Sequence, residues 1–96
     1  MPRPGKLSPE EISQEMSQLE GWSITDGKLV RDFKFDSFAE AFGFMTAAAI
    51  HAQEMDHHPD WSNSYTAVHI ELISHDVGGV SLRDFNLARK IGALYE

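Results

Sequence analysis

Two adjacent histidines, His57 and His58, are the residues of this chain best suited to proton transfer. Imidazole is the only side chain whose unperturbed pKa lies near neutrality, so it can act as an acid or as a base at physiological pH. Pro59 follows the pair at once, and a further histidine, His75, lies just before a Gly-Gly pair. This histidine set, in a chain without cysteine, predicts acid/base chemistry on a flat polar substrate.

The residues before the pair predict the backbone that carries it. Ser37 and Glu40 form a capping box, and a helix from about Phe38 to Met55 follows. Its helical spacing is marked by Phe38, Phe42, Met45 and Ala49. Because a residue before proline is disfavoured in a helix, this helix must end around the histidine pair. Both imidazoles are therefore expected on a turn that leads from a helix into a strand.

Helix signals and hairpin signals alternate along the rest of the chain. Ser8 and Glu11 cap a short amphipathic helix that Gly21 ends, and Ser81 caps a last helix. This last helix should bury Leu87, Ile91 and Leu94. The predicted strands are residues 22–25, 29–35, 60–64 and 67–74, and Asp26-Gly27 is the turn between the first two.

The order α-β-β-α-β-β-α predicts an α+β fold, with a four-stranded antiparallel sheet that carries the three helices on one face. Residues 1–7 are predicted to be a flexible N-terminal tail, and residues 8–96 to form a single domain. A domain this small gains core by self-association, so a homo-oligomer is expected.

The charge of the chain excludes several partners. Fifteen Asp and Glu against eight Lys and Arg give a net charge of -7, which repels nucleic acid and anionic membranes. The absence of cysteine excludes disulfides and thiolate metal sites. The start of the chain lacks a secretory signal pattern, and the longest stretch without charge, residues 41–53, is too short to span a membrane. We expect a soluble cytoplasmic protein that binds neither nucleic acid nor membranes.

A set of spaced motifs extends from about Leu7 to the C-terminus. The motifs are Ala41 to Thr46, Asp56-His57-His58-Pro59, Trp61, Asn63, Tyr65, Val68-His69-Ile70, His75, Arg83-Asp84 and Asn86-Leu87-Ala88. Through them the chain closely resembles the pterin-4a-carbinolamine dehydratases, known in animals also as dimerisation cofactors of a homeodomain transcription factor. The chain departs from that family at Gln53, where the family pattern has a charged residue.

The resemblance implies the fold given above and a specific activity. Family members remove water from 4a-hydroxytetrahydrobiopterin to give a quinonoid dihydropterin, which recycles the cofactor of aromatic amino-acid hydroxylases. They need no metal or organic cofactor, and they form homodimers or homotetramers; a hydroxylase is a further partner implied. By position, the implied catalytic residues are His57, His58, His75 and Asp84. The implied pterin-binding residues are Asp56, His57, His58, Ile73, Ser74, His75 and Asp76.

The division of labour among these residues is a further prediction. Expelling a hydroxyl from carbon 4a needs an acid for the leaving oxygen and a base for the N5 proton. We assign His58 as the acid and His75 as the base, an order that can be exchanged, and His57 to orientation of the substrate. Trp61 is predicted as an aromatic wall for the pterin, with hairpin packing as the alternative. Asp84 either orients the pocket or caps the last helix, and the two roles are compatible.

Two other functional classes remain as alternatives. One is a non-catalytic assembly cofactor or transcriptional coactivator on the same scaffold. The other is a metal-dependent hydrolase, because histidines and carboxylates also bind zinc. Adjacent histidines differ from a same-face i, i+4 pair and the chain has no HExxH motif, so we predict no metal site. His51 and His69 are expected to be solvated or structural.

Overall fold

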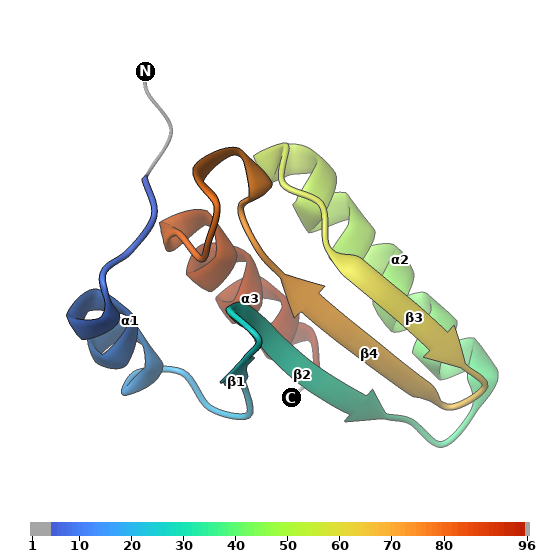
Figure 1. The fold of residues 1–96 in the computed structure, drawn as a ribbon. Coiled ribbons are helices and arrows are strands. Elements are labelled where there is room, and N and C mark those ends of the chain that lie inside the picture. The colour runs from blue at the N-terminus through green and yellow to red at the C-terminus, as the bar shows by residue number, and fades with distance from the viewer. Residues whose placement is uncertain (1–4, 96) are drawn as a thin grey trace.

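Three helices and one four-stranded antiparallel sheet form the fold, in the predicted order, and the α+β prediction is confirmed. The structure, a computed structural model, describes residues 5–95. The strand order in the sheet is β1-β2-β4-β3. Helices α2 and α3 lie against one face of the sheet, and α1 lies to one side near β1 (Figure 1). The elements are α1 Pro9–Met16, β1 Ser23–Thr25, β2 Lys28–Lys34, α2 Phe38–Met55, β3 Asp60–Ser64, β4 Ala67–Leu72, the 3-10 turn η1 His75–Val77 and α3 Leu82–Tyr95.

The core lies between the sheet and helices α2 and α3. Alternate residues of a strand point to the same face, and the apolar residues of β2 and β4 that face the helices are buried. They are Leu29, Phe33, Val68, Ile70 and Leu72. Helix α3 adds Leu87 and Ile91 as predicted, but Leu94 is exposed. At that point α3 has reached the end of β2, and Leu94 borders a groove instead of the sheet.

Helix α2 has the predicted extent, but the side of the helix that the apolar spacing predicted to be buried is not the side that faces the core. Its buried residues are Ala41, Phe44, Ala48 and Ala52, and the three small alanine side chains let the helix approach the sheet closely. Phe38, Phe42 and Ile50 are 48%, 55% and 57% exposed. Because residues 41–53 carry no charge, the helix is apolar on several sides, and periodicity cannot select the side that faces the core.

The N-terminal segment differs from the prediction at two points. Helix α1 ends at Met16, before Gly21, because the Ser17 hydroxyl donates to the Gln14 carbonyl at 2.6 Å and the next residues form tight turns. Leu7, assigned to the flexible tail, is buried, and its N–H donates to the Val80 carbonyl at 2.9 Å. The remaining tail prediction, for residues 1–4, lies outside the described residues.

The hairpin turn at Asp26-Gly27 is confirmed. Both residues have positive φ, 51° and 75°, as the type I′ turn between two-residue hairpin strands requires. Strand β4 is shorter than predicted and ends at Leu72. Ser74 instead pairs with Gly79, which closes the short loop that contains η1.

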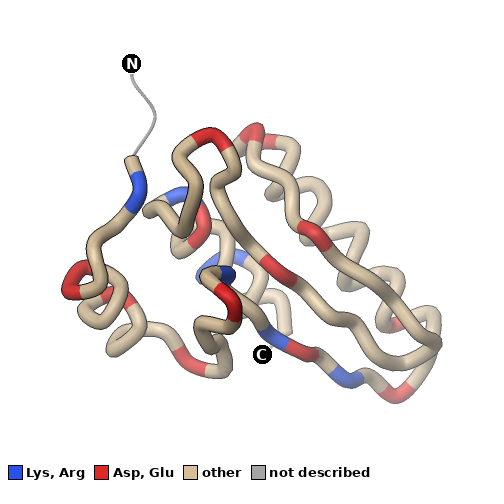
Figure 2. The backbone as a smooth tube through the Cα atoms, viewed as in Figure 1, with Lys and Arg blue, Asp and Glu red and all other residues tan. Residues whose placement is uncertain are grey.

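Acidic residues outnumber basic ones, fifteen to eight, and Figure 2 shows both kinds distributed along the chain. No helix within residues 5–95 is both long enough and apolar enough to cross a membrane.

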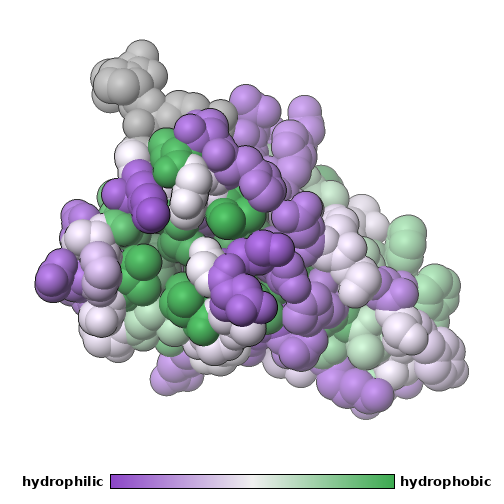
Figure 3. All heavy atoms as spheres, in the orientation of Figure 1, coloured by the Kyte–Doolittle hydropathy of each residue, from purple (hydrophilic) through white to green (hydrophobic). Residues whose placement is uncertain are grey.

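The sheet face that α2 and α3 leave uncovered is polar over its middle (Figure 3). His69 lies on this face between two carboxylates, with Nδ1 at 2.6 Å from Asp32 Oδ1 and Nε2 at 2.9 Å from Glu71 Oε2. Glu71 also accepts from Lys28 Nζ at 3.2 Å. The hydrogen bond to Glu71, followed by that to Asp32, raises the pKa of His69 above its ordinary value. The same His69 contact lowers the pKa of Glu71.

These two pKa shifts predict a pH-dependent stability. A raised pKa in the folded state stabilises the protein below the unfolded pKa of about 6.5, and this effect is lost as the pH rises through the folded pKa of His69. The lowered pKa of Glu71 has its effect at acid pH, because the stability it contributes is lost as the pH falls through the folded pKa of Glu71. His69→Gln should therefore lower Tm by about 1–4 °C at pH 6 and leave it unchanged at pH 9. Thermal denaturation at both pH values checks this, and an equal loss at pH 9 would contradict it.

Candidate active site

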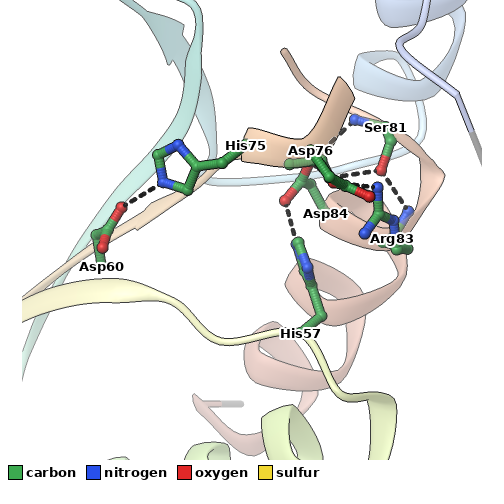
Figure 4. A network of polar contacts seen from close by, with 8 residues as sticks. His57, Asp60, His75, Asp76, Ser81, Arg83 and Asp84 are labelled. Atoms are coloured by element: carbon green, nitrogen blue, oxygen red, sulfur yellow. Dashed lines mark hydrogen bonds and ion pairs between the residues drawn. The ribbon is translucent and has the colours of Figure 1, made fainter. Parts of the chain in front are cut away.

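Three segments that are distant in sequence meet around one pocket of about 380 Å³. They are the turn after α2, the η1 turn and the first turn of α3 (Figure 4). Pockets of this size accommodate small organic ligands. The residues that line it are Asp56, His57, His58, Pro59, Asp60, Ile73, His75, Asp76 and Arg83. A larger groove of about 620 Å³ between Lys34 and Tyr95 contains no histidine, so size alone does not identify the catalytic candidate.

The way in which α2 ends places the histidine pair. Asp56 adopts left-handed backbone with φ 51°. Its N–H donates to the Gln53 carbonyl at 3.1 Å, and the His57 N–H donates to the Ala52 carbonyl at 3.0 Å. These two bonds form a Schellman motif, which ends the helix and reverses the direction of the chain. As a result His57 is buried while its neighbour His58 is exposed.

A buried carboxylate holds His57. Asp84 has no exposed surface, and its Oδ1 lies 2.5 Å from His57 Nε2. Its Oδ2 accepts from the Ser74 hydroxyl at 2.8 Å and from the Ser81 N–H at 2.9 Å. Since an ionised carboxylate only accepts hydrogen bonds, His57 donates through Nε2–H, which fixes the orientation of its ring. Asp84 thus caps α3 and orients His57 at the same time.

The two exposed imidazoles have different oxygen partners. His58 Nε2 lies 3.1 Å from the Gln53 side-chain oxygen, which only accepts, so Nε2 carries a hydrogen. His75 is 75% exposed in its side chain, and its Nε2 lies 3.5 Å from Asp60 Oδ2. The departure from the family pattern at Gln53 therefore concerns the partner of His58.

Arg83 forms part of the pocket wall. Its side chain is largely buried, and its Nη2 donates to Asp76 Oδ1 at 2.8 Å. This contact joins the first turn of α3 to η1. Sequence reasoning assigned no role to Arg83 or Asp60, because each role depends on a contact with another segment. It noted Gln53 as the departure from the family pattern, and it noted Arg83 as part of the Arg83-Asp84 motif.

The structure brings together most of the predicted site residues. Those at the pocket are Asp56, His57, His58, Ile73, His75 and Asp76, while Ser74 and Asp84 lie buried behind the wall as the partners described above. Trp61 does not line this pocket. It pairs with Ile70 across β3 and β4 and packs against the core, which agrees with the alternative role of hairpin packing.

No group of three or more His, Cys, Asp or Glu side chains within residues 5–95 is arranged to hold a metal ion.

Comparison with known proteins identifies a family that has this fold. The model of the family described as pterin 4 alpha carbinolamine dehydratase matches residues 5–94, and the chain belongs to this family. A relative from Solibacter usitatus, provisionally named a pterin-4-alpha-carbinolamine dehydratase, is 47% identical over 89 residues. The match covers 93% of this chain and 94% of the relative. A relative from Prochlorococcus marinus with the same provisional name is 49% identical, with 92% of each chain covered.

Two solved structures share the fold. A transcriptional coactivator/pterin dehydratase from Brucella melitensis has a TM-score of 0.92 and 39% identity, over 96% of this chain and 100% of its own. A pterin dehydratase-like protein identified as a RuBisCO assembly factor in the alpha-carboxysome has a TM-score of 0.63 and 25% identity. That similarity covers 77% of this chain and 86% of the assembly factor.

Proposed function

We propose that this protein is a hydro-lyase that converts 4a-hydroxytetrahydrobiopterin to quinonoid dihydropterin and so recycles the cofactor of aromatic amino-acid hydroxylases. The observation that supports this most is the convergence of His57, His58 and His75 on one pocket in a chain of this family. A flat heterocycle with several hydrogen-bonding groups suits a wall of imidazoles, carboxylates and the Arg83 guanidinium. The cytoplasmic location and a hydroxylase partner stay predictions from the sequence.

The proposed reaction breaks one C–O bond and moves two protons. An acid protonates the 4a-hydroxyl, which leaves as water, and a base takes the proton from N5 as the C4a–N5 double bond forms. His58 and His75 are the proposed acid and base, because both are exposed at the pocket and reach the ligand without a rearrangement of the core. Each group must come within about 2.6–3.2 Å of its proton-transfer partner in the reacting complex.

His57 has a different role in this proposal. Its ring is buried and donates to Asp84, so it is held in one orientation at the inner end of the pocket. We assign it to binding and orienting the pterin, with Asp84 as its positioning residue. Asp60 and Gln53 are positioning residues for His75 and His58.

The activity has a direct test. Purified protein should accelerate dehydration of freshly generated 4a-hydroxytetrahydropterin, followed by stopped-flow ultraviolet absorbance. The rate should be the same in excess chelator, because imidazoles alone supply the acid and the base. A folded protein that leaves the uncatalysed time course unchanged would overturn the proposal. Loss of the rate in chelator would instead indicate a metal-dependent reaction.

A specific surface favours a second candidate function, that of an assembly cofactor or coactivator. Phe38, Phe42 and Ile50 expose much of their side chains along the outer side of α2. Large exposed apolar patches mark interaction sites. The similar structures include a transcriptional coactivator/pterin dehydratase and a RuBisCO assembly factor. An inactive protein that retained a partner on this surface would support the second function.

We also propose that the protein is a homodimer or homotetramer that uses this side of α2. Light scattering at micromolar concentration should give a multiple of 10.8 kDa. Phe42→Glu places a charge on the exposed stripe and should shift the mass toward monomer, since burying an unpaired charge opposes association. Glu54→Gln, near the other end of the same helix, is the control and should not reduce the mass. A monomeric wild-type protein would contradict the proposal.

A further inference from the structure

A second hollow lies between the loop that follows α1 and the C-terminal half of α3. Its volume is about 320 Å³. It shares no lining residue with the pocket around His57, His58 and His75, called the histidine pocket below. Leu19, Ala88 and Ala93 supply apolar lining, and the side chains of Trp22 and Arg31 also border it. The hollow is therefore separate from the proposed reaction.

Arg31 is a half-buried cation that has no acidic partner among residues 5–95. It lies on β2 on the side of the sheet that faces the helices, with its Cζ 4.6 Å from the centre of the Phe33 ring and 5.2 Å from that of Tyr95. Its hydrogen bond to protein runs from Nη1 to the Glu20 carbonyl at 3.3 Å. Within residues 5–95 no carboxylate lies within ion-pair distance of this guanidinium. A guanidinium has several N–H donors in a planar fork, and most of those of Arg31 remain available.

Trp22 supplies a second donor. Its side chain is buried, with 5% exposure, and its indole N–H has no acceptor among the described residues. Buried donors are nearly always paired, so this one is open to an acceptor from outside the described residues. The indole N–H alone carries no charge and selects no ligand, but it lies beside the guanidinium.

Gly92 of α3 shows that the two donors face the same space. A Cβ atom at this position would lie 3.4 Å from Arg31 Nη1 and 3.9 Å from Trp22 Nε1. The glycine thus leaves open the small volume that both donors border. Because the indole nitrogen has almost no accessible surface, an acceptor reaches it only when a neighbouring side chain moves, and the Arg31 side chain borders the same space. Arg31 is half-buried on a flexible stem, so this requires a change of rotamer and no change of backbone.

We propose that this hollow binds the carboxylate of a small organic monoanion, with Arg31 and the Trp22 indole as donors and the apolar part of the ligand against Leu19, Ala88 and Ala93. The charges around the hollow favour a ligand with a single negative group. The other cation at the hollow, Arg89, is already paired with Glu15 at 2.5 Å, and Glu20 adds a negative charge to the lining. One unpaired guanidinium matches one carboxylate, whereas a phosphate dianion would meet a protein of net charge -7 with too little compensation.

The two tryptophans of the chain allow a direct test by NMR. In ¹⁵N-labelled protein, titration with hexanoate should shift the indole N–H signal of Trp22 in a saturable way and leave that of Trp61 in place. Hexanamide, which has the same chain without the charge, should shift neither signal. A response to hexanamide equal to that of hexanoate, or a stronger response to inorganic phosphate, would overturn the assignment to a carboxylate.

Two variants test the donors separately. Arg31→Gln should weaken hexanoate binding about tenfold or more, because a charge-assisted hydrogen bond is lost. Gly92→Ala fills the shared space with a methyl group in ordinary van der Waals contact, so it should keep the fold and still abolish the Trp22 shift. Lys90→Gln removes an exposed cation two positions away and should bind as wild type. Unchanged affinity in both Arg31→Gln and Gly92→Ala would refute the site. The dehydration rate should be unaffected in all three variants, because none of these residues lines the histidine pocket.

Discussion

Replacement of either His58 or His75 by alanine should lower the rate of pterin dehydration by about 10²-fold or more. Both imidazoles line the pocket and are exposed to an incoming ligand, so each loss removes a proton donor or acceptor without disturbing the core. Stopped-flow assays of each variant, at matched folding checked by circular dichroism, measure the effect. If both residues act in one concerted step, the double variant should lose less than the product of the single losses.

The chain supplies its own controls for this experiment. His51 lies on α2 near Glu54, and His69 lies on the open face of the sheet between Asp32 and Glu71. Neither lines the histidine pocket, so His51→Ala and His69→Ala should leave the rate nearly unchanged. Full activity in His58→Ala or in His75→Ala would refute the proposed roles. A large loss of rate in either control would mean that removing a histidine lowers the rate by disturbing the fold.

Features that depend on local sequence were predicted well. The capping box at Ser8, the type I′ turn at Asp26-Gly27 and the end of α2 before Pro59 each involve residues within a few positions of one another. Local hydrogen bonds and backbone preferences determine such features. The position of the histidine pair on a helix-to-strand turn followed from them, and so did the order of the elements.

Features that depend on distant segments were harder to predict. The buried side of α2 is set by which face meets the sheet, and the sequence of the helix is apolar on several sides. The partners of the histidines also come from distant segments. Asp84 lies 27 residues from His57, and Asp60 lies on β3 whereas His75 lies on η1. Trp61 had two alternative roles in sequence, and only the register with β4 places it toward the core.

The buried network around Asp84 should be the most sensitive part of the structure to substitution. Its carboxylate accepts from His57, from the Ser74 hydroxyl and from the Ser81 N–H, with no exposure to water. Asp84→Ala removes all three acceptor contacts and leaves buried donors unpaired, so it should lower the free energy of unfolding by about 3–5 kcal/mol. Chemical denaturation monitored by tryptophan fluorescence measures this loss.

Asp84→Asn separates the loss of charge from the loss of shape. If the amide oxygen keeps the contacts with Ser81 and Ser74, the amide nitrogen faces His57 Nε2 and donates to it. The ring of His57 must then carry its hydrogen on Nδ1, a change that ¹⁵N NMR of the imidazole detects. We expect a loss of about 1–3 kcal/mol for this variant, smaller than for alanine because most contacts remain.

In a double-mutant cycle, His57→Ala and Asp84→Ala together should cost less than the sum of the single losses, since each single variant leaves the other side chain buried without its partner. Strict additivity would show that the two side chains, although 2.5 Å apart, do not depend on each other for stability.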